Sequence, residues 1–84
     1  MRTELLLNFN KVVRAISSGY DRFGDYGAVE VVRNHYKQVK NVTILKEMLH
    51  WVEAAIIDQP FNRGYYSTRR AILSRIDSLS SSSI

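Results

Sequence analysis

The most constraining feature of this sequence is that apolar residues recur at steps of three and four over four successive segments. Such spacing places side chains on one face of an α-helix, whereas strands alternate at every second residue. The clearest stripe consists of Leu5, Leu6, Phe9, Val12, Val13 and Ile16. It predicts a helix over 4–18 with Thr3 as N-cap and Gly19 at its end, because glycine tolerates the left-handed backbone common at helix C-termini.

The segment 19–27 interrupts this regularity with three glycines that alternate with three aromatic residues. We predict an ordered loop here, whose aromatic side chains cover one end of the core. Asp25 is then a suitable N-cap for a second helix over 26–39. The shared face of this helix consists of Ala28, Val29, Val32, Tyr36 and Val39. The β-branched run at 28–32 leaves a short strand open as the alternative.

Two further helices are predicted in the second half of the chain. The third, over 42–58, has the widest apolar arc and ends before Pro60, so it is the predicted centre of the fold. The fourth, over 67–79, has Ser67 as its N-cap. Its inner face consists of Ile72, Leu73, Ile76 and Leu79. Together the segments predict an all-α fold, a compact bundle of three to four short helices.

The length and the residue types also limit organisation and compartment. With 84 residues there is room for one domain, predicted over 1–79, followed by a flexible serine-rich tail at 80–84. The chain contains no cysteine, which suits a reducing compartment, and we expect a cytoplasmic location. The leucine run at 5–7 is too short for a secretory signal or a membrane span, so no membrane partner is expected.

Catalytic and metal chemistry have little support in the sequence. The only two histidines, His35 and His50, fall on different predicted helices, without a serine nucleophile motif nearby. Glu47 and His50 have the Glu-x-x-His spacing of di-metal bundles, but such sites need a second copy and inward-facing ligands. We therefore expect no enzymatic activity, no cofactor and no metal.

A basic fourth helix is the main indication of nucleic-acid binding. The net charge is +4, and arginines gather around 63–75 beside two tyrosines that are suited to stacking on unpaired bases. The candidate residues are Arg63, Tyr65, Tyr66, Arg69, Arg70 and Arg75. On a helical wheel Arg69, Arg70 and Arg75 point in different directions, which is typical of a solvated helix and not of one that reads a groove.

Protein binding is the preferred functional class. Trp51 and Ile44 lie at the margin of the apolar arc of the third helix, and Ile57 lies outside it, where large apolar side chains commonly anchor partners. The alternative is that Trp51 packs against the fourth helix. We expect a small non-enzymatic adaptor or inhibitor that masks or bridges surfaces of a larger protein with an acidic face. A homodimer is the alternative assembly, and a nucleic-acid-binding regulator is the alternative function.

Overall fold

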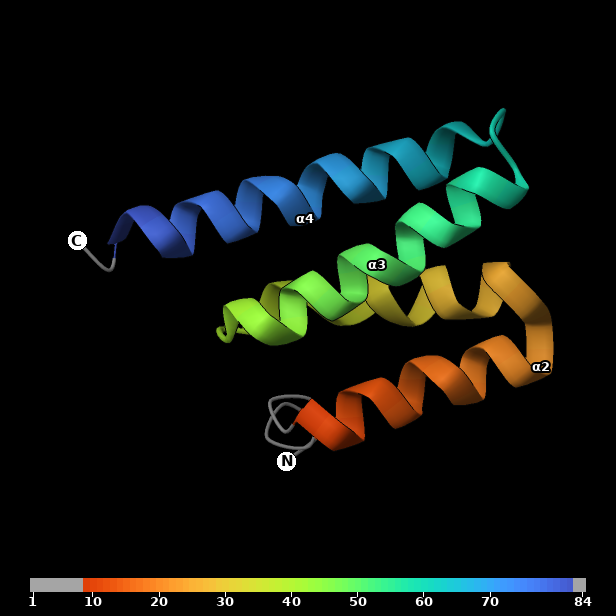
Figure 1. Ribbon diagram of the computed structural model, residues 1–84, viewed down its shortest axis with the longest axis horizontal. Helices are drawn as coiled ribbons and strands as arrows, with labels where there is room; N and C mark the ends of the chain where they lie inside the picture. The colour runs from red at the N-terminus through yellow and green to blue at the C-terminus, as the bar shows by residue number, and fades with distance from the viewer. Residues whose placement is uncertain (1–8, 83–84) are drawn as a thin grey trace.

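The computed structural model describes residues 9–82, and the regular structure in this range is helical. The elements are α2 at Phe9–His35, the 3-10 helix η1 at Tyr36–Gln38, α3 at Val42–Asp58 and α4 at Arg63–Ser82 (Figure 1). The all-α prediction is confirmed, with three α-helices over the described range. Within these residues no helix combines the length and the hydropathy needed to cross a bilayer.

The chain forms two helical hairpins, one from the two arms of α2 and one from α3 and α4. The two hairpins pack on each other through α3. α2 folds back on itself near Gly24, and the turn at 59–62 joins α3 to α4 (Figure 1). Both reversals lie at the same end of the molecule, which we call the bend end (Gly24 and 59–62 with the residues beside them). Since α3 contacts both α2 and α4, which barely touch each other, α3 is central as predicted. The Cα radius of gyration is 12.2 Å, as expected for a compact chain.

The glycine-rich segment 19–27 is helical and not a loop, so this sequence-based prediction is wrong. Gly24 alone departs from helical geometry, with φ 65° and ψ −148°, a region that residues with a Cβ rarely enter. Gly19 does not end a helix. Asp25 already has helical backbone angles, so Gly24 and not Asp25 holds the N-cap position of the second arm of α2.

Gly19 and Gly27 have a packing role. The two arms of α2 cross so closely that a Cβ on Gly19 would lie 2.7 Å from the carbonyl oxygen of Gly27. A Cβ on Gly27 would overlap the carbonyl oxygen of Gly19. Glycine at both positions permits this contact between backbones. These glycines therefore close a helical hairpin where a loop was predicted.

The first two predicted helices correspond to the arms of α2, but their ends differ. The first prediction, 4–18, begins outside the described residues, and the helix continues past Gly19. The second prediction, 26–39, is too long, because α2 gives way to η1 before its predicted end. The β-branched run at 28–32 is helical, so the strand alternative is wrong.

The predicted third helix over 42–58 is confirmed as α3. Asn41 caps its N-terminus, because its side-chain oxygen accepts hydrogen bonds from the backbone N–H groups of Thr43 at 2.8 Å and Ile44 at 3.4 Å. The helix ends before Pro60, which supports the use of proline as a stop signal.

α4 is longer than the predicted fourth helix at both ends. Asn62 and not Ser67 precedes it as N-cap, since the side-chain oxygen of Asn62 accepts a hydrogen bond from the backbone N–H of Tyr65 at 3.3 Å. At its C-terminus α4 continues to Ser82, so the first serines of the predicted tail at 80–84 are helical.

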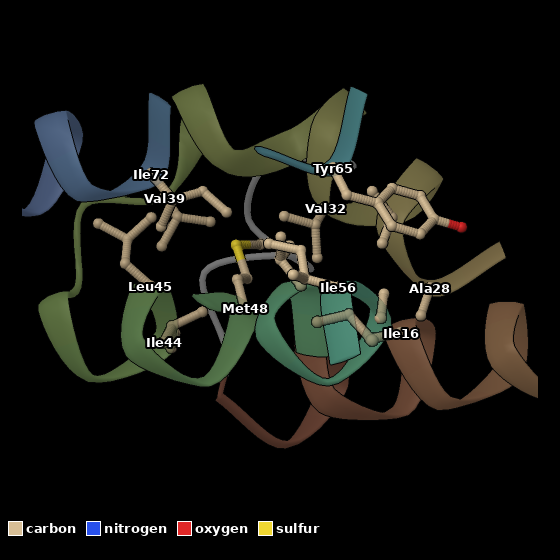
Figure 2. Packing of buried hydrophobic residues seen from close by; sticks show 13 residues of the cluster. Ile16, Ala28, Val32, Val39, Ile44, Leu45, Met48, Ile56, Tyr65 and Ile72 are labelled. Atoms are coloured by element: carbon tan, nitrogen blue, oxygen red, sulfur yellow. The ribbon is translucent and has the colours of Figure 1, made fainter. Parts of the chain in front are cut away.

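The core is built from side chains of all three α-helices together with Val39 (Figure 2). Its buried members are Ile16, Ala28, Val29, Val32, Val39, Ile44, Leu45, Met48, Val52, Ala55, Ile56, Tyr65 and Ile72. Tyr65 is the largest of them, and its hydroxyl points out of the cluster (Figure 2). Leu73, which was predicted to face inward, is 46% exposed, because α4 turns Ile72 toward the core.

Candidate functional site

The three predicted interface residues lie in different environments. Ile44 is fully buried, because α3 is covered on two sides, so its side chain is not accessible at the surface. Trp51 is half-buried, and the aromatic ring next to it is Tyr20 of α2 and not a residue of α4. Ile57 is 81% exposed near the end of α3. Trp51 and Ile57 are therefore the accessible part of the predicted interface.

A pocket of about 650 Å³ lies beside Trp51, between α2 and the second half of α3. It is lined by Tyr20, Asp25, Trp51, Ala54, Ile57 and Asp58. We call it the Trp51 pocket. The rings of Tyr20 and Trp51 form its aromatic wall, with centroids 5.5 Å apart and planes inclined by 53°. Asp25 and Asp58 add two carboxyl groups, so the lining of the pocket is partly apolar and partly acidic.

Asp25 and Asp58 come together because both chain reversals lie at the bend end. Asp25 follows the break in α2, and Asp58 is the last residue of α3. Burial, hydrogen bonding with Asp58 and the negative charge of Asp58 raise the pKa of Asp25 above its ordinary value. Among the described residues no lysine or arginine forms an ion pair with either carboxyl group. The acid pair is therefore not neutralised from within this part of the chain.

A buried hydroxyl lies near the acid pair. Tyr65 is only 2% exposed, and its hydroxyl has no hydrogen-bond partner among the described residues. Burial raises the pKa of Tyr65, and the charges of Asp25 and Asp58 add to this effect. A buried polar group without a partner costs about 1–3 kcal/mol, so each such group needs an explanation, for example a bound molecule.

Sequence reasoning missed Tyr20, Asp25 and Asp58 as members of one site. Tyr20 was assigned to a loop, Asp25 to a helix cap, and Asp58 to the last turn of a helix. The available signal was that all three lie close in sequence to a chain reversal. It was not sufficient, because only the packing of α2 on α3 places the two reversals at the same end.

Two of the six predicted nucleic-acid residues have structural roles. Tyr65 belongs to the core and cannot stack on a base. Arg75 donates two hydrogen bonds to the carbonyl oxygen of Val39, from Nε at 3.2 Å and from Nη2 at 3.0 Å. Because Val39 follows η1 in an extended conformation, Arg75 ties α4 to the connection before α3.

The other four predicted nucleic-acid residues are accessible to different degrees. Arg63 and Arg70 are exposed. The guanidinium carbon of Arg69 lies 5.3 Å from the ring centroid of Tyr66, so it occupies one face of the ring that was predicted to stack on a base. The hydroxyl of Tyr66 donates to the carbonyl oxygen of Pro60 at 2.8 Å, which holds this ring against the turn. The basic residues thus form no continuous binding stripe.

The Glu-x-x-His step of α3 has no further ligands around it. Glu47 is half-buried and His50 is exposed. Residues 9–82 contain no group of three or more histidine, aspartate or glutamate side chains placed to hold a metal ion.

Removing the charge of Asp58 tests the pairing of the two acids. In Asp58→Asn we expect the pKa of Asp25 to move down toward its ordinary value of 3.8, because the repulsion disappears while burial remains. The titration of the Asp25 carboxyl carbon by ¹³C NMR measures this change. Asp77→Asn, an exposed acid on α4, is the matched control and should leave the titration of Asp25 unchanged. An unchanged pKa of Asp25 in Asp58→Asn would contradict the pairing.

The raised pKa of Asp25 determines how the contribution of this residue to folding stability changes with pH. The pKa of Asp25 is higher in the folded state than in the unfolded chain. The contribution of Asp25 is therefore fully present below its unfolded-state pKa and is lost as the pH rises through its folded-state pKa. Asp58→Asn should make this loss smaller.

Comparisons with known proteins assign no function to the pocket. No family model matches the sequence, and neither a curated protein nor a solved structure matches it significantly. The Trp51 pocket has to be interpreted from its own residues.

Proposed function

We propose that this protein is a small non-enzymatic adaptor or inhibitor that binds a larger protein through its bend end. The supporting observation is that large apolar side chains remain exposed close to the two chain reversals. They are Tyr20 at 44%, Phe23 at 67%, Tyr26 at 58%, Ile57 at 81% and Phe61 at 96% exposure. The first three lie around Gly24, Ile57 precedes the turn at 59–62, and Phe61 lies within it.

Exposure of this size has an energetic consequence. Each Å² of apolar surface that leaves water in a complex contributes about 25 cal/mol, before the costs of association. The core of the domain does not need these side chains, since its buried cluster lies between the helices. Monomeric proteins seldom expose contiguous apolar surface without a use for it, and aromatic residues are enriched among the residues that dominate binding energy.

Nucleic-acid binding is the second candidate function, supported by the net charge of +4 and by exposed Arg63 and Arg70. It ranks lower because Tyr65 is buried, Arg75 is engaged with backbone and Arg69 covers the Tyr66 ring. We keep the cytoplasm as the proposed compartment, because a chain without cysteine suits a reducing environment.

A charge placed on the apolar surface tests the proposed interface. Ile57→Glu should weaken partner binding at least about 30-fold, because the carboxylate would have to lose its hydration in the contact. Affinity capture from nuclease-treated host lysate identifies the partner, and calorimetric titration with the purified partner measures the affinity. Leu73→Glu is the matched control, since Leu73 is 46% exposed in the middle of α4.

The outcomes of this test are distinct. Circular dichroism should show that both variants keep their helices. Loss of the partner in Ile57→Glu alone supports an interface at the bend end. Equal affinity of Ile57→Glu and the wild type contradicts the proposal. A partner that disappears on nuclease treatment favours the nucleic-acid function, and a stable dimer in sedimentation velocity would identify a second copy of the chain as the occupant.

A further inference from the structure

The lining of the Trp51 pocket is acidic. Asp25 and Asp58 place two carboxyl groups at a pocket of about 650 Å³. No ion pair within residues 9–82 neutralises either group. A positively charged group in the pocket would offset the repulsion between the carboxylates. It would also donate hydrogen bonds to them in place of water.

The aromatic residues of the pocket suit the aliphatic stem of a cationic ligand. The rings of Tyr20 and Trp51 stand next to the acid pair, and aromatic faces attract cations. The same rings, with Ala54 and Ile57, form an apolar wall for the methylene stem of a long side chain. The volume lies in the range of about 300–1,000 Å³ that is common for ligand pockets.

The hydroxyl of Tyr65 belongs to the core and not to the lining of the pocket. It is buried, has no partner among the described residues and points away from the aliphatic cluster (Figure 2). Burial and the charges of Asp25 and Asp58 raise its pKa. An ammonium group has three N–H donors, and the carboxylates of Asp25 and Asp58 supply acceptors for them in the pocket.

We propose that the Trp51 pocket binds a lysine or arginine side chain of the partner protein. Asp25 and Asp58 hold the charged group, and Tyr20 and Trp51 cover its stem. This inference rests on the proposed protein-binding function and specifies the chemistry of the partner. It replaces the sequence-based expectation of an acidic partner face at this contact. Salt screens interactions between exposed charges that lie more than about 8 Å apart, so the net charge of +4 has little influence on this contact. The carboxylates of the pocket, in contrast, contact the ligand directly.

The single tryptophan of the chain gives a direct readout of the pocket. Its indole N–H produces one resolved NMR signal. We expect Nα-acetyl-arginine amide and Nα-acetyl-lysine amide, at millimolar concentration, to shift this signal in a saturable way. Nα-acetyl-norleucine amide, which has a similar stem and no charge, should not shift it.

Neutralising the acid pair tests the role of the two carboxyl groups. The double variant Asp25→Asn with Asp58→Asn should weaken the apparent affinity for the arginine probe at least about tenfold. It should stay folded, because the substitution removes a repulsion. Asp77→Asn is the matched control with the same charge change on exposed α4 surface, and its affinity should equal that of the wild type.

The double variant also separates this inference from the proposed function. If the partner depends on Ile57 but binds the double variant as tightly as the wild type, the cationic contact is wrong and the interface stands. If the arginine probe binds but Ile57→Glu leaves partner binding unchanged, the cation site is supported and the proposed interface is wrong. Equal shifts from the norleucine and arginine probes would overturn the cation site.

Discussion

Gly27→Ala is expected to destabilise the fold strongly, because the two arms of α2 meet backbone to backbone at this position. The new Cβ would overlap the carbonyl oxygen of Gly19, and this neighbour is backbone that cannot rotate away. The two arms of α2 would have to separate, and Ile16 on the first arm would lose its packing in the core. We expect a loss of at least about 3 kcal/mol, out of the roughly 4–13 kcal/mol that a domain of this size has in total.

Urea denaturation measures this effect, with circular dichroism for helix content and Trp51 fluorescence for the α2–α3 contact. Gly64→Ala is the matched control. Its Cβ would approach Arg33 Nη2 at 3.1 Å and Asn62 Oδ1 at 3.3 Å, which are the ends of side chains that can move. Gly64 lies in the first turn of α4 and meets no backbone atom, so Gly64→Ala should change the free energy of unfolding much less than Gly27→Ala does. A wild-type midpoint for Gly27→Ala would show that the arms of α2 do not touch here.

Helical periodicity was sufficient to predict the fold class and the whole of α3. This helix packs on both sides, so its stripe is wide, and Asn41 and Pro60 mark its ends with unambiguous chemistry. The same approach failed at 19–27. A glycine in a sequence shows only that a side chain is missing. Whether it provides a positive φ, as Gly24 does, or a close contact between backbones depends on the segment that lies opposite.

Only part of the candidate site could be predicted from the sequence, because its residues come from segments that meet only in the folded chain. The position of Trp51 at the edge of an apolar arc follows from the sequence of α3 alone. Asp25 and Asp58 belong to different helices, and their meeting depends on two bends at one end of the molecule. Tyr65 was misassigned because α4 was predicted to start too late. Once the helix begins at Arg63, Tyr65 lies two turns from Ile72 on the inner face.

Tyr65 therefore gives the second large prediction. Tyr65→Ala should destabilise the fold by about 3–5 kcal/mol, because the largest fully buried side chain would be replaced by a cavity. Tyr65→Phe keeps the ring and removes only a hydroxyl that has no partner among the described residues. Its free energy of unfolding should stay within about 1 kcal/mol of the wild-type value or increase. Urea titrations of the two variants measure the difference.

The pair of variants also distinguishes the roles assigned to this position. A tyrosine that stacks on bases would tolerate alanine in the fold and lose nucleic-acid affinity, whereas a core tyrosine behaves in the opposite way. Because Tyr65 does not line the Trp51 pocket, Tyr65→Phe should remain folded and bind the arginine probe as tightly as the wild type. A strongly destabilised Tyr65→Phe would contradict this assignment, since it would mean that the hydroxyl already has a hydrogen-bond partner in the free protein.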